Sequence, residues 1–184
     1  MYFQTKKQDF PINFSCYFVC FGYPNLFIIP HNTCFDLPLN IGLLTNNQIN
    51  GSLIDLACLS FGIKVVPIPL NSTSQHVSYI VDHAQITHLF IGGKTGIKLW
   101  SDIKAIHTIN VISLDDSDFN RPGLTSWEEF LELADNINNF DIDARLMSVQ
   151  MEDLQTIMYT SGTTANPKGI VFNQIHIISK RFAR

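Results

Sequence analysis

An apolar run leads directly into a hydroxyl-rich turn in the stretch Ile157-Met158-Tyr159-Thr160-Ser161-Gly162-Thr163-Thr164-Ala165-Asn166-Pro167-Lys168-Gly169. Four hydroxyl side chains occupy the five positions 160–164, and a lysine follows them. Hydroxyls and backbone N–H groups donate to phosphate oxygens, a glycine lets the backbone approach closely, and a lysine supplies positive charge. The alternative is an ordinary polar turn, but such turns do not commonly end in Pro-Lys-Gly after an apolar strand. The stretch therefore predicts a polyphosphate-binding loop, to which a helix starting after Gly169 would add its positive end.

Two look-alikes of the Walker A phosphate loop occur in the chain, and neither fits that motif. The stretch above ends in Pro167-Lys168-Gly169 where Walker A needs Gly-Lys-Ser/Thr. The triplet Gly93-Lys94-Thr95 has a suitable ending, but His88 stands where the opening glycine belongs. We expect Gly92–Gly96 to be a loop between a strand and a helix.

Strand and helix patterns alternate along the chain from residue 41 onward. Such alternation predicts βαβ units, and hence an α/β fold with a mostly parallel sheet and flanking helices. Ligands in such sheets bind at the carboxyl ends of strands, which is where the phosphate loop falls. Strands are expected at Lys64–Ile68, Thr87–Ile91, Val111–Leu114 and Thr156–Tyr159. Helices are expected from Ile49 to a stop at Gly62, after Ser72 or Thr73, near Ile97–Ile106, after Ser126 and near Asn173.

Composition narrows the class of protein. Apolar residues make up 46% of the chain and charged residues 15%, which is enough to fill a core and argues against disorder. The net charge of −4 offers no basic surface to a nucleic acid. The apolar run Cys16–Ile29 is too short for a membrane span and makes a poor signal peptide. We therefore expect a cytoplasmic protein without a transmembrane segment, for which peripheral membrane contact stays open.

The residues with metal-ligating or redox chemistry show no functional spacing. The four cysteines, Cys16, Cys20, Cys34 and Cys58, form neither CxxC pairs nor zinc spacing. We expect them to be reduced, and we expect no metal site built from protein side chains. The histidines His76, His83, His88 and His107 are interpreted as structural, and Asp115, Asp116 and Asp118 as a solvated turn.

The loop resembles the signature of the AMP-binding, adenylate-forming superfamily. That superfamily contains acyl-CoA synthetases, nonribosomal adenylation domains and firefly-type luciferases. The resemblance spans roughly residues 40–184 and favours the N-terminal part of a long-chain fatty acid–CoA ligase. It also rests on Leu43–Asn47, Asp55–Cys58, Gly62, Val65–Pro67, Tyr79–Val81 with His83, Ser126–Phe130 and Asp153–Tyr159.

The resemblance implies a two-step reaction. A fatty acid carboxylate attacks the α-phosphate of ATP, giving an acyl-adenylate and pyrophosphate, and the thiol of coenzyme A then takes the acyl group. The loop would hold the β- and γ-phosphates together with Mg²⁺, mainly by positioning and charge neutralisation. On this resemblance the ATP-binding residues are Thr160, Ser161, Gly162, Thr163, Thr164, Lys168 and Gly169.

The match to the family breaks in three places. Ala165 stands where the family usually has glycine, and a Cβ there costs about 1 kcal/mol if the position needs a positive φ. The family's catalytic groups are expected beyond residue 184, so the chain resembles an incomplete N-terminal subdomain. Residues 1–40 form a divergent segment, separate from a partial AMP-binding domain at 41–184.

Two functions stay open at this point. The chain is a fragment of an AMP-forming acyl-CoA synthetase, inactive by itself, with ATP, fatty acid and coenzyme A as the parent's substrates. Alternatively it is a non-catalytic nucleotide- or pyrophosphate-binding remnant, or a subunit that another chain completes.

Overall fold

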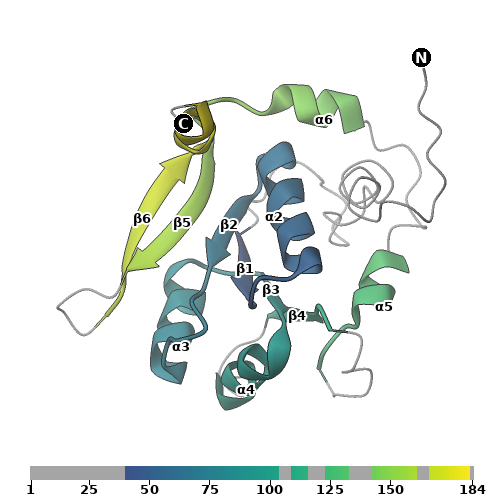
Figure 1. Ribbon diagram of the computed structural model, residues 1–184, viewed down its shortest axis with the longest axis vertical. Helices are drawn as coiled ribbons and strands as arrows, with labels where there is room; N and C mark the ends of the chain where they lie inside the picture. Colours follow the sequence, from purple (N-terminus) through teal and green to yellow (C-terminus); the bar gives the residue numbers. More distant parts are fainter. Residues whose placement is uncertain (1–39, 104–108, 116–122, 133–141, 161–165, 183–184) are drawn as a thin grey trace.

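The computed structural model describes residues 40–103, 109–115, 123–132, 142–160 and 166–182. They form one six-stranded sheet with helices on both faces, as Figure 1 shows. The expected α/β class with a mostly parallel sheet is therefore confirmed. The carboxyl ends of the parallel strands share one edge of this sheet, which is where ligands bind in open sheets of this kind.

The sheet has the strand order β4-β3-β1-β2-β5-β6, in which the first five strands run parallel. The last strand, β6, is antiparallel to β5. Each parallel step crosses over through at least one helix, as parallel neighbours require. The strands are β1 Asn40–Leu44, β2 Lys64–Pro67, β3 His88–Ile91, β4 Asn110–Ser113, β5 Leu154–Thr160 and β6 Lys168–Asn173.

The helices begin and end largely at the residues that their capping chemistry predicts. Gly62 ends α2 in the left-handed conformation at φ 63°, which a glycine adopts without strain. Thr73 caps α3, because its hydroxyl accepts a hydrogen bond from the N–H of His76. The helices are α2 Ile49–Phe61, α3 Ser74–His83, α4 Gly93–Ile103, α5 Trp127–Glu132, α6 Ile142–Ser148 and α7 Gln174–Phe182.

Two hydrophobic cores lie on the two faces of the sheet. On β1, the side chains of Ile41 and Leu43 join the core under α2 and α5, whereas Leu44 joins the core under α3 and α4. This division follows from the two-residue period of a strand. Because both faces are covered, the middle strands β1, β2 and β3 are apolar after their first residues, Asn40, Lys64 and His88.

Three sequence-based expectations were wrong or incomplete. Gly169 lies within the strand β6, so no helix starts beside the loop, whereas the helix expected near Asn173 does begin at Gln174. Gly93–Gly96 is not a loop but the first turn of α4. The short helix α6 lies in a stretch that the sequence showed only as polar. Hydrophobic period alone missed β6 because its first four residues, 168–171, are all exposed, so burial does not alternate along this edge strand.

None of the helices in the described ranges has the length and apolarity needed to cross a membrane.

Candidate phosphate-binding site

The two residues that flank the predicted loop face each other across a strand pair. Thr160 ends β5, Lys168 begins β6, and the two form the last pair of the antiparallel register. Both side chains are exposed. Since directly opposite residues project to the same face, the side chains of Thr160 and Lys168 both leave the hairpin on one face at the base of the loop.

The two faces of this hairpin carry different chemistry. Met158, Thr160 and Lys168 belong to one face by their alternation along the strands, and Tyr159 and Gly169 belong to the other. Tyr159 is buried in the core beneath α3 and α4. A ligand held by Thr160 and Lys168 would therefore lie on the face opposite α3.

Most of the predicted ligand set lies outside the described residues. That holds for Ser161, Gly162, Thr163 and Thr164, and also for Ala165. The structure thus places Thr160, Lys168 and Gly169 at one end of the hairpin, and the roles of all seven residues stay predictions.

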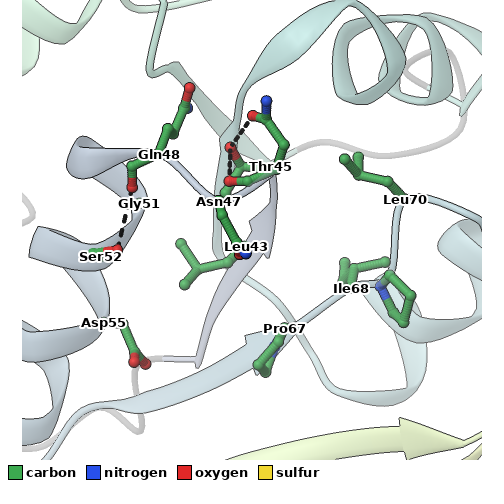
Figure 2. A pocket seen from close by; sticks show the side chains of 12 residues that line it. Leu43, Thr45, Asn47, Gln48, Gly51, Ser52, Asp55, Pro67, Ile68 and Leu70 are labelled. Atoms are coloured by element: carbon green, nitrogen blue, oxygen red, sulfur yellow. Dashed lines mark hydrogen bonds between the residues drawn. The ribbon is translucent and has the colours of Figure 1, made fainter.

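A pocket opens beside the carboxyl ends of β1 and β2 (Figure 2), with a volume of about 410 Å³. Thr45 and Gln48 line it from the segment between β1 and α2, and Ser52 lines it from the first turn of α2, where its hydroxyl donates to the carbonyl of Gln48 at 3.2 Å. Pro67 and Ile68 line it from the strand β2 and the segment after it. Because β5 is the parallel neighbour of β2, the pocket and the loop open on the same edge of the sheet. No sequence motif predicted this pocket, since its lining comes from two separate segments.

The second glycine-lysine candidate has a structural role. The backbone N–H of Gly93 donates to Oδ2 of Asp115 at 2.5 Å, so a carboxylate already satisfies this donor at the start of α4. A negative charge is favourable at a helix N-terminus. Asp115 is half-buried there, which corrects its interpretation as a solvated turn residue. Asp116 and Asp118 lie outside the described residues.

Comparison with known proteins shows similarity to AMP-binding enzymes. The family model for the AMP-binding enzyme matches residues 39–183. Long chain acyl-CoA synthetase 2 of Arabidopsis thaliana is 32% identical over 131 residues, which cover 66% of this chain and 19% of that protein. Long-chain-fatty-acid–CoA ligase ACSBG2 of Rattus norvegicus is 26% identical over 145 residues, covering 74% of this chain and 21% of its own length.

A solved structure shares the fold. The fatty acyl CoA synthetase of Mycobacterium tuberculosis superposes with a TM-score of 0.62 at 17% identity, over 94% of this chain and 30% of that one. At this identity the likeness concerns the fold alone. The two acyl-CoA synthetase relatives named above are much longer than this chain, which spans about a fifth of their length.

Proposed function

Because the chain belongs to the AMP-binding enzyme family, we propose that it corresponds to the N-terminal part of an AMP-forming acyl-CoA synthetase. In the complete enzyme, ATP would activate a fatty acid as its acyl-adenylate, and coenzyme A would receive the acyl group. Residues 41–184 would be the partial AMP-binding domain and residues 1–40 a separate segment. The long-chain relatives support a fatty acid as the substrate class, and the cytoplasm is the proposed compartment.

The observation that carries this proposal is the pairing of Thr160 with Lys168 at the carboxyl edge of the sheet. An ammonium group and a hydroxyl on one face provide a charge-assisted donor and a neutral donor for phosphate oxygens. Since the residues between them are the hydroxyl-rich segment 161–164, a polyphosphate would meet further donors within the loop. We assign the β- and γ-phosphates of ATP, with Mg²⁺ bound to their oxygens, to Thr160, Ser161, Gly162, Thr163, Thr164, Lys168 and Gly169.

A second candidate function follows from the extent of the match. Because the chain spans about a fifth of its curated relatives, it would carry only part of an ATP site. By itself it would act as a nucleotide- or pyrophosphate-binding unit, or as a subunit that another chain completes. We propose that the isolated chain does not catalyse the full reaction.

The proposal is tested by measuring the binding of Mg²⁺-pyrophosphate and Mg²⁺-ATP to the purified chain by titration calorimetry. Lys168→Ala should weaken binding at least about tenfold, the value of a charge-assisted hydrogen bond. Lys180→Ala is the matched control, because Lys180 is exposed on α7, at the other end of β6 from the loop. Equal affinities for wild type and Lys168→Ala would refute the loop assignment. Fatty-acid-dependent exchange of pyrophosphate into ATP would refute the inactivity of the isolated chain.

A further inference from the structure

The end of α3 is joined to the base of the proposed phosphate loop by one hydrogen bond between side chains. Nδ1 of His83, the last residue of α3, lies 2.7 Å from the hydroxyl oxygen of Tyr159. Tyr159 directly precedes Thr160 and is only 8% exposed. Figure 1 shows α3 near the end of the hairpin at which β5 ends and β6 begins. The contact therefore ties the strand that enters the loop to a helix 76 residues earlier in the chain.

The ring of Tyr159 also packs against β6, the strand that leaves the loop. Gly169 is its partner in the antiparallel register, and a Cβ built on Gly169 would lie 3.3 Å from Cζ and 3.4 Å from Cε1 of the ring. Among the described glycines, positive φ values occur at Gly62, Gly93 and Gly123, not at Gly169. The backbone of Gly169 thus does not itself require a glycine. What favours glycine is the packing of two side chains against it, the ring of Tyr159 and Ile157, whose Cγ2 would lie 3.2 Å from that Cβ.

Aromatic packing fixes the orientation of His83. The ring of Tyr79, one turn earlier on α3, stacks on His83 with centroids 5.1 Å apart and an interplanar angle of 25°. The Tyr159 ring meets His83 edge-on at 5.8 Å and 86°. Stacked and edge-to-face arrangements are the geometries that aromatic pairs prefer. His83 therefore presents Nδ1 to Tyr159 from a position that a second ring supports.

The protonation states suit this hydrogen bond. Burial, and secondarily the neighbouring Tyr79, raises the pKa of Tyr159 above its ordinary value of 10.0. The phenol therefore keeps its proton at neutral pH and can donate it. Nδ1 of His83 accepts in the tautomer that carries the ring proton on Nε2, a tautomer assigned from this hydrogen bond.

On the premise that Thr160–Gly169 binds phosphate, we propose that His83 and Tyr159 are positioning residues of that loop. The hydroxyl of Tyr159 bonds β5, the strand that enters the loop, to α3. Its ring packs against Gly169 of β6, the strand that leaves the loop. Thr160 and Lys168 are the next residues toward the loop on these two strands. The pair thereby fixes the spacing of the backbone at Thr160 and Lys168, which pair in the register, before any ligand arrives. Such preorganisation raises affinity by lowering the entropy lost on binding.

The test combines a ligand-free measurement with a binding measurement on the full chain. Tyr159→Phe and His83→Ala should speed amide hydrogen exchange in residues 156–170 without ligand. They should also weaken the binding of Mg²⁺-pyrophosphate about two- to tenfold, the range that the loss of one neutral hydrogen bond allows. His83→Asn, whose amide can reach toward the position of Nδ1, should restore the affinity to within about twofold. Tyr79→Phe, which removes a neighbouring hydroxyl but keeps the stacked ring, should match wild type in both measurements.

The outcomes separate this role from a merely structural one. If Tyr159→Phe and His83→Ala lower the melting temperature but leave both exchange and affinity at wild-type values, the positioning role is overturned. If no form of the chain binds pyrophosphate, or if Lys168→Ala binds as wild type does, the proposed function fails. The exchange measurement still decides in that case, because faster exchange in 156–170 supports the anchoring and unchanged exchange overturns it.

Discussion

Gly96 in the first turn of α4 lies directly against the backbone carbonyl of Leu44, the last residue of β1. A Cβ built on Gly96 would be 2.6 Å from that oxygen. The oxygen cannot easily move away, since it also accepts a hydrogen bond from the N–H of Gly92 at 3.1 Å. We therefore predict that Gly96→Ala lowers the free energy of unfolding by about 1–3 kcal/mol. The gain of about 1 kcal/mol in helix propensity would not offset this overpacking.

Urea denaturation measures the effect, and Lys98→Ala on the same helix is the control. Lys98 is exposed, so its replacement should change the free energy of unfolding by no more than about 0.5 kcal/mol. A Gly96→Ala variant as stable as wild type would show that α4 can move away from β1.

The same contact explains why the sequence misled us at Gly92–Gly96. Glycines usually mark loops, and nothing local distinguishes a loop glycine from one that a neighbouring strand requires. Here the close approach of β1 selects the glycine, and β1 lies about fifty residues earlier in the sequence. Local chemistry was informative where its cause was local, as at Gly62 and Thr73.

The reciprocal cap at the start of α5 gives a second prediction. The N–H of Ser126 donates to Oε2 of Glu129 at 2.8 Å, and the N–H of Glu129 donates to Oγ of Ser126 at 3.1 Å. Ser126→Ala should lower the free energy of unfolding by about 1 kcal/mol, because one helix-end donor loses its acceptor. Ser126→Asp, which keeps an acceptor oxygen, is the matched control for chemical denaturation. A loss as large in Ser126→Asp as in Ser126→Ala would exclude the cap as the cause.

In the candidate site too, the features with a local cause in the sequence were predictable and those that depend on distant residues were not. The motif was enough to select Thr160 and Lys168, because the hydroxyls, the glycine and the lysine are contiguous in the sequence. The pairing of these two residues could not be predicted, because it depends on the strand β6, which the hydrophobic period did not reveal. The contact between His83 and Tyr159 was not predictable, since a helix-terminal histidine gives no sign of its distant partner.

A third prediction concerns acid sensitivity. Burial lowers the pKa of His88 below its ordinary value of 6.5. Its Nε2 lies 3.1 Å from Nδ2 of Asn110, a donor, and its Nδ1 lies 3.1 Å from the Thr87 hydroxyl. A proton added at Nε2 would place two donors face to face, which agrees with a lowered pKa. Below about pH 6.5 the unfolded chain binds this proton more readily than the folded chain, so the free energy of unfolding should fall as pH falls.

Urea denaturation between about pH 7.5 and 5.5 tests this, since His titrates there whereas carboxylates titrate lower. His88→Asn should lose stability less steeply on acidification than wild type, whatever its absolute stability. His76→Asn, in the first turn of α3, serves as the control and should keep the wild-type slope. Parallel curves for wild type and His88→Asn would mean that His88 does not contribute to the pH dependence.

The last prediction concerns how α7 is held against the body of the fold. Nε2 of Gln174 donates to Oε1 of Gln155 at 3.1 Å and to the carbonyl of Leu59 at 2.9 Å. Gln155 and Gln174 are 1% and 3% exposed, so water cannot readily replace these bonds. Gln174→Ala should lower the free energy of unfolding by about 1–3 kcal/mol, because it leaves one buried and one half-buried acceptor without this donor.

A double-mutant cycle with Gln155→Ala separates the bond between the two side chains from the bond to Leu59. We expect a coupling energy of about 0.5–1.5 kcal/mol, the net value of one neutral hydrogen bond. The remaining cost of Gln174→Ala then belongs to the Leu59 carbonyl and to the lost packing. Gln75→Ala, on the exposed side of α3, controls for glutamine replacement in a helix and should be neutral to within about 0.5 kcal/mol. Additive effects in the cycle would show that Gln155 and Gln174 act independently, so that α7 is held by Leu59 and by packing alone.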